Sequence, residues 1–132
     1  KGPDDANLDR IQIIKGWVDA DGEPQDRVFD VVWSGARAPG ADGKLPAVGN
    51  TVALARATST NTIGSAELIG NWTDPQFDPQ QGAVYYVRVL QIPTPRWSTY
   101  DAVRAGLPLQ EGVAATVQER AWTSPIWYTP KG

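Results

Sequence analysis

LDRIQIIKGWV, residues 8–18, decides the fold, because β-branched and aromatic residues dominate it with polar residues set between them. The next seven residues, DADGEPQ at 19–25, gather the Asp, Gly and Pro that favour tight turns. Apolar and polar residues then alternate again in DRVFDVVWSG, residues 26–35. We therefore expect a β-hairpin with a long tip.

Further strands follow from the same reasoning along the chain. The strongest pattern is AVYYVRVLQI at 83–92, which predicts a central strand buried on both faces. Weaker patterns predict a third strand at 51–60 (TVALARATST) and a short one at 66–72 (AELIGNW). The last segment, 115–129 (ATVQERAWTSPIWYT), indicates one or two strands broken at Pro125.

The connecting segments have their own signals. GARAPGADGKLPAVG at 35–49 predicts a long surface loop, and the Asp-Pro steps of TDPQFDPQQG at 73–82 predict turns. One short helix is expected near 99–105, with Ser98 or Thr99 as its cap. Asp101 would lie in its first turn and Arg104 in its last, with Gly106 just after.

The predicted fold class is mainly β, an antiparallel sandwich of immunoglobulin-like or fibronectin-like type with that single helix. At 132 residues the chain fits one domain, 1–132, in which the polar residues 1–7 read as a linker. The polar, Asp-rich opening without Met indicates a piece of a longer polypeptide.

Composition excludes several kinds of chemistry. The chain has no His and no Cys, which removes histidine-based zinc sites, Ser-His-Asp triads and cysteine nucleophiles. No pair of carboxylates stands out for glycoside hydrolysis. The formal net charge of −3 argues against a nucleic-acid partner, and no apolar run is long enough to span a membrane. We expect no catalytic residue, metal or cofactor in this chain.

Two aromatic segments are the candidate binding or interface sites. PTPRWSTYD at 93–101 follows the strongest strand, and an Arg beside aromatic rings can bind an anion or a partner surface. AWTSPIWY at 121–128 adds two more tryptophans, and the six tryptophans of the chain, as flat rings, could together form a carbohydrate-binding platform. The plainer alternative is packing within the fold or between domains, with the arginine paired to an Asp. The candidates are Arg96, Trp97, Tyr100, Asp101, Trp122 and Trp127.

Long segments of the chain, in order, resemble a known family. DANLDRIQIIKGWVD, VFDVVWSG, GNTV, YYVRVLQIPTPRWSTYDA and ERAWTSPIWYTP together are similar to the C-terminal end of domain-of-unknown-function family 3604. The resemblance implies an exported bacterial protein, in the periplasm or outside the cell, whose upstream region is similar to the PHP class of metal-dependent phosphoesterases. Any divalent metal would belong to that upstream region, because none of its ligand motifs lies in this chain.

From these observations we expect a non-catalytic accessory β domain whose partner is the upstream domain of the same polypeptide. The alternative is an independent module that binds a carbohydrate or an anion through exposed tryptophans and Arg96. A free-standing carboxylate enzyme ranks last.

Overall fold

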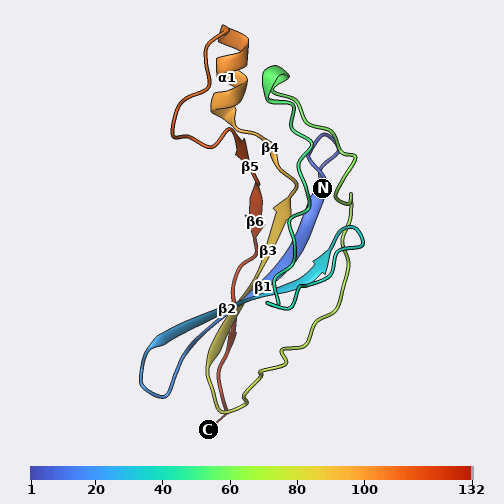
Figure 1. Ribbon diagram of the computed structural model, residues 1–132. Helices are drawn as coiled ribbons and strands as arrows, with labels where there is room; N and C mark the ends of the chain where they lie inside the picture. Colours follow the sequence, from blue (N-terminus) through green and yellow to red (C-terminus); the bar gives the residue numbers. More distant parts are fainter. Residues whose placement is uncertain (132) are drawn as a thin grey trace.

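The computed structural model describes residues 1–131 and shows one antiparallel sheet of five strands. Strands β1 (Leu8–Val18), β2 (Pro24–Trp33) and β3 (Ala83–Gln91) are long and lie in the order β2-β1-β3. Two short strands, β6 (Arg120–Trp122) and β7 (Ile126–Tyr128), both pair with β3 and continue the sheet (Figure 1). The sheet therefore ends in β2 on one side and in the interrupted pair β6 and β7 on the other.

The predicted hairpin is confirmed. β1 pairs with β2 in an antiparallel register that places Ile13 opposite Phe29, with a bulge between Ile11 and Gln12. At the tip, Asp19 Oδ1 accepts hydrogen bonds from the backbone N–H groups of Asp21 and Glu23. The side chain of Asp19 therefore stabilises the Asp-rich turn by hydrogen bonds to its backbone, as the sequence predicts.

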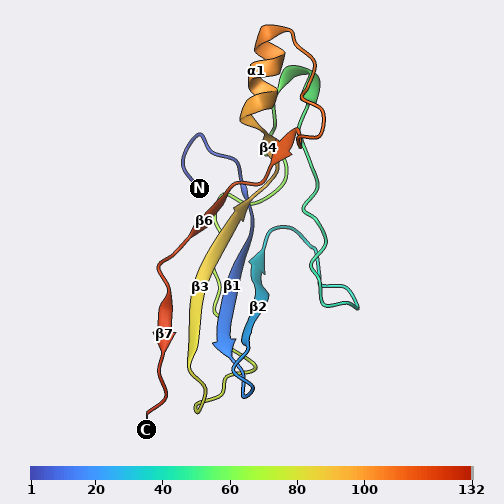
Figure 2. The same cartoon turned by 90° about the vertical axis from the view of Figure 1, so that its left-hand side faces the viewer.

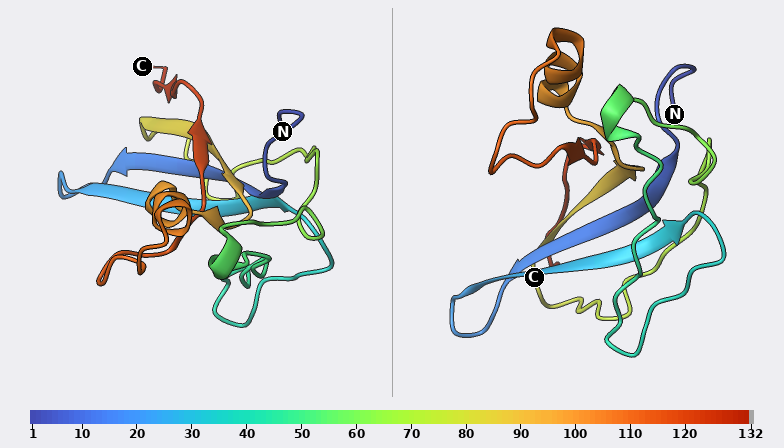
Figure 3. Two further views of the ribbon diagram at one scale, coloured as in Figure 1. Left: turned by 90° about the horizontal axis from the view of Figure 1, so that it is seen from above. Right: turned by 45° about the horizontal axis from the view of Figure 1, so that its top comes forward.

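A smaller unit lies beyond one end of the sheet (Figures 1 and 3). It comprises a two-stranded ribbon of β4 (Thr94–Pro95) and β5 (Thr116–Val117), the helix α1 (Trp97–Ala105), and a short 3₁₀ helix, η1 (Leu54–Arg56). α1 and η1 contact each other. The predicted break near Pro125 is confirmed by the gap between β6 and β7.

Two predicted strands are wrong. Within residues 51–60 only Leu54–Arg56 are regular, as η1, closed by Ala57 with a left-handed φ of 48°, because alternating alanines gave no apolar face for a sheet to bury. Residues 66–72 form no strand. Gly70 lies so close to Val32 of β2 that a Cβ at position 70 would clash with that side chain. The segment therefore packs on side chains of β2 instead of pairing with its edge.

The helix is confirmed, but its start differs from the prediction. It begins at Trp97 after Arg96, and no side chain caps it. Thr99 is buried inside the helix, where its Oγ1 donates to the carbonyl of Ala115, so it holds the helix onto β5 instead of capping it. Asp101 accordingly lies outside the first turn. The end follows the prediction, since Gly106 adopts a left-handed φ of 65° just after Ala105.

The core is thin, and β3 is less buried than its apolar sequence predicts. Only Ala83 and Leu90 of β3 are buried, because the described residues supply no second large sheet to face the first. The architecture is thus mainly β, with antiparallel pairing and one short helix. Among residues 1–131 the buried apolar side chains are Ile14, Leu45, Ala57, Ala83, Leu90 and Ile92.

Candidate functional site

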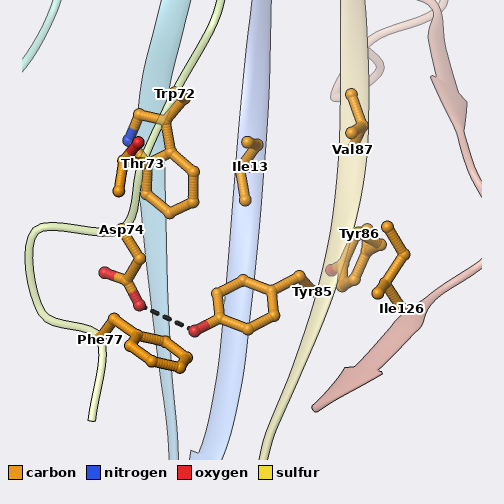
Figure 4. Close-up of a pocket in the computed structure, with 9 residues that line it drawn as sticks. All are labelled: Ile13, Trp72, Thr73, Asp74, Phe77, Tyr85, Tyr86, Val87 and Ile126. Carbon is orange, nitrogen blue, oxygen red and sulfur yellow. Dashed lines mark hydrogen bonds between the residues drawn. The ribbon is translucent and has the colours of Figure 1, made fainter. Parts of the chain in front are cut away.

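The two faces of the sheet have different surroundings. On the covered face, Ile13 and Tyr85 lie under the chain between residues 72 and 77 (Figure 4). Lys15 lies on the same face and contacts Asp74 of this segment. On the opposite side, which we call the open face, the register brings Gln12, Val84, Arg88, Trp122 and Trp127 together. Figure 2 shows the sheet from this second side, with the 66–82 segment passing behind it.

A cavity of about 450 Å³ lies on the covered face between the sheet and the 72–77 segment. Trp72 covers one side of the cavity. The centroid of the Trp72 ring lies 5.0 Å from that of Phe29 and 6.4 Å from that of Tyr85. The walls are nearly all apolar, so the cavity suits an apolar group. Its lining comprises Ile13, Trp72, Thr73, Asp74, Phe77, Tyr85, Tyr86, Val87 and Ile126 (Figure 4).

An ion pair borders this cavity. Lys15 Nζ lies 2.7 Å from Asp74 Oδ2 and also donates to the carbonyl of Gln76. The Tyr85 hydroxyl donates to the same Asp74 oxygen at 2.8 Å, while Asp74 Oδ1 accepts from the Gln76 N–H. Both oxygens of the carboxylate are thus occupied, and the group fastens the 72–77 segment to β1 and β3.

The protonation states of this group do not suit proton transfer. Burial alone would raise the pKa of Asp74, but hydrogen bonds from Lys15, the Gln76 N–H and Tyr85 outweigh it and lower the pKa below the usual 3.8. Burial, together with the hydrogen bond to Asp74, raises the pKa of Tyr85 to about 12. At neutral pH the carboxylate is ionised and the phenol is protonated, so neither is poised as a general acid or base.

A second charged cluster fastens the 35–49 loop. Asp9 is only 1% exposed and accepts hydrogen bonds from Arg10, Arg37 and Gln118. Both arginines also donate to the carbonyl of Pro46. Sequence reasoning missed this cluster, although an Asp beside an Arg inside a predicted strand was a usable signal. Its groups are satisfied by one another, so we interpret it as structural.

The sequence-predicted site residues fall into two separate groups. Arg96, Trp97, Tyr100 and Asp101 lie at α1, beyond the end of the sheet, where Trp97 is 70% exposed and Tyr100 is half-buried. Packing within the fold, the plainer alternative, is therefore not the role of Trp97 among the residues that the structure describes. Among residues 1–131 the side chain of Arg96 forms no ion pair, so the expected pairing with an Asp is absent there.

The other two predicted residues meet on the open face. Trp122 lies opposite Arg88 and Trp127 opposite Val84, so the two indoles point to the same side of the sheet. Four residue steps of β3 separate their positions, which is about 13 Å. They are 59% and 74% exposed, so this edge of the sheet displays two large aromatic side chains to its surroundings.

No metal site accompanies these features. Within residues 1–131, no group of three or more acidic side chains is placed to hold a metal ion. The helices of the same residues are too short to cross a membrane.

The family model described as "Protein of unknown function (DUF3604)" matches residues 1–130. The chain belongs to this family. No curated protein and no solved structure gives a match. The DUF3604 match contains the hairpin, the covered cavity and the open face, so each of these features lies within the family region.

Proposed function

We propose that this DUF3604 chain is a non-catalytic structural β domain that packs against another domain of the same polypeptide. The main observation behind the proposal is the solvent-accessible surface area of the chain. The chain exposes 8854 Å², whereas a compact protein of 14.3 kDa exposes about 6,800 Å². The excess of about 2,000 Å² is larger than the roughly 800 Å² that each partner buries in a standard interface.

The distribution of exposed apolar side chains supports the same proposal. Trp127 and Val18 border a hollow of about 470 Å³ over Gly16, which lacks a side chain to fill it. Trp122 adds a second exposed aromatic side chain on the same edge of the sheet. Large exposed apolar surface on a soluble protein often marks a place where something binds.

Within residues 1–131 no group of three or more acidic side chains is placed to hold a metal ion, which is compatible with a structural role. The neighbouring domain in this proposal is the upstream, PHP-like region of an exported bacterial protein, with this chain as its C-terminal domain. Any divalent metal and any hydrolysis of phosphate esters would then belong to that region. A layer supplied by the neighbour would complete the immunoglobulin-like sandwich that the sequence predicts.

The test is a truncation of the full-length protein. We would assay it with divalent metal against a panel of phosphate and sulfate esters, beside a version lacking residues 1–132. The proposal predicts that truncation lowers both the thermal stability of the remaining part and any ester hydrolysis. Truncation that leaves stability and hydrolysis unchanged would show that this chain is not packed against the rest of the protein.

A carbohydrate-binding module is the second candidate, because Trp122 and Trp127 face the same way on one sheet edge. Two exposed rings about 13 Å apart span several sugar units of an extended chain. Co-sedimentation of the full-length protein with insoluble polysaccharides tests this candidate. Replacing Trp97, which lies off the sheet, provides the matched control.

A further inference from the structure

The open face carries two arginines without carboxylate partners. Arg88 lies opposite Trp122 and Leu90 opposite Arg120, so both arginines point to the same side and stand diagonally across β3 and β6. Neither forms an ion pair with any residue of 1–131. Diagonal neighbours in a sheet are within reach of long side chains. The pair therefore places two arginines on one face of the sheet, with the Arg88 side chain reaching towards Gln12 of β1, in a chain whose formal net charge is −3.

Arg88 is held in one orientation by a row of hydrogen bonds across three strands. Its Nε donates to Gln12 Oε1 at 2.8 Å, and Gln12 Nε2 donates to Asp30 Oδ1 at 2.8 Å. Arg10 in turn donates to Asp30 Oδ2. The two terminal nitrogens of Arg88 have no hydrogen-bond partner among residues 1–131. A guanidinium fixed through Nε, with its other donors free, is suited to binding a carboxylate.

Three other basic side chains differ from Arg88 because each has a negatively charged partner. Lys15, Arg10 and Arg37 are mostly buried, and each contacts an Asp carboxylate. Arg88 is half-buried too, yet its charge is unmatched. A half-buried cation without a counter-charge is unfavourable, so the partner of this face is expected to supply one.

We propose that Arg88 and Arg120 bind an Asp or Glu carboxylate of the neighbouring domain, whose apolar groups pack on Trp122 and Trp127. This inference rests on the proposed function and adds the chemistry of the contact. Trp and Arg are the residue types most enriched where binding energy concentrates in interfaces. The hollow over Gly16 receives an apolar side chain of the same partner.

The test uses hydroxyl-radical footprinting of the full-length protein, with oxidation of each tryptophan measured by mass spectrometry. Trp97 is the internal reference, because its exposure in this chain is similar to that of Trp122 and Trp127. We expect Trp122 and Trp127 to be oxidised about tenfold more slowly than Trp97 in the wild type. Arg88→Gln and Arg120→Gln should each raise oxidation of Trp122 severalfold.

Arg120→Gln is the more secure variant, since Arg120 is exposed and its loss leaves the Gln12 network intact. Arg104→Gln on α1 is the matched control and should change nothing. High salt should act in the same direction as the two interface variants, because screening weakens a contact between charges.

Four outcomes would overturn the inference. If Trp122 and Trp127 stay protected in both arginine variants, the carboxylate contact is contradicted while the proposed packing remains supported. Protection of Trp97 alone would move the interface to α1. Rapid oxidation of all three would remove the packing as well as this inference. Protection of Trp122 that appears only after adding polygalacturonate would assign the face to an acidic polysaccharide.

Discussion

Lys15 Nζ and Asp74 Oδ2 lie 2.7 Å apart, with the two side chains only 4% and 6% exposed. The contact joins the middle of β1 to a segment almost sixty residues later in the chain, a segment that has no strand or helix of its own. This segment supplies Trp72, which covers Phe29 and Tyr85. The ion pair therefore helps to hold an irregular segment over one face of the sheet, together with the aromatic contacts of Trp72.

Asp74→Ala should destabilise the chain by about 3 kcal/mol, because it leaves the buried ammonium of Lys15 without a counter-charge. Urea unfolding followed by tryptophan fluorescence measures the change. The matched control is Asp78→Ala, since Asp78 is also followed by Pro and makes the same turn bond, to the N–H of Gln80, but contacts no cation. Equal losses in the two variants would show that the ion pair contributes nothing beyond the turn.

The same cluster predicts a loss of stability in alkali. The pKa of Tyr85 is raised from 10.0 to about 12, so the folded protein holds this proton more tightly than the unfolded chain. The stabilisation is complete below pH 10 and is lost as the pH rises towards 12. Tyr85→Phe should flatten the fall in unfolding free energy over this interval, whereas Tyr86→Phe should preserve it. A Tyr85→Phe profile identical to that of the wild type would contradict the assignment.

The fold could be predicted from the sequence where β-branched residues, or turn-forming residues, are concentrated in one segment. The hairpin of β1 and β2, the strand β3 and the helix α1 all appear where β-branched runs, turn residues and Gly106 indicate them. The two wrong strands lie where the sequence alternates weakly. In an extended segment 51–60, one face would carry mostly alanine and the other a mixture of apolar and polar residues. Neither face would offer enough apolar area to define a strand.

The site was less predictable, for a physical reason. Trp122 and Trp127 were named as candidates from the sequence, but their shared face depends on a register with β3 that no local pattern encodes. Arg88 was missed, since a single arginine in a strand is ordinary until its neighbours are known. Lys15 and Asp74 were missed in the same way, because their pairing depends on where a long irregular segment crosses the sheet.

Gly64 should be far less tolerant of alanine than Gly22, although both have positive φ, of 77° and 86°. A Cβ at Gly64 would lie 2.7 Å from both Asn7 Cβ and Ile92 Cγ2, whereas one at Gly22 meets nothing within 4 Å. We expect Gly22→Ala to cost about 1 kcal/mol from the backbone alone. Gly64→Ala should cost at least about 3 kcal/mol, because fully buried Ile92 must move. Similar melting temperatures for the two variants would contradict this packing.

Trp72 should respond differently from Trp122 and Trp127 when each is replaced by alanine. Trp72 is half-buried against Phe29 and Tyr85, so Trp72→Ala should destabilise the 132-residue chain by about 2 kcal/mol. Trp122→Ala and Trp127→Ala should each change the stability of this chain by less than about 0.5 kcal/mol, because their rings are mostly exposed. In the full-length protein the last two substitutions should become costly, since the proposed partner then covers both rings. Urea unfolding of both proteins measures the contrast, and equal effects of Trp127→Ala in the two would argue that this face stays open.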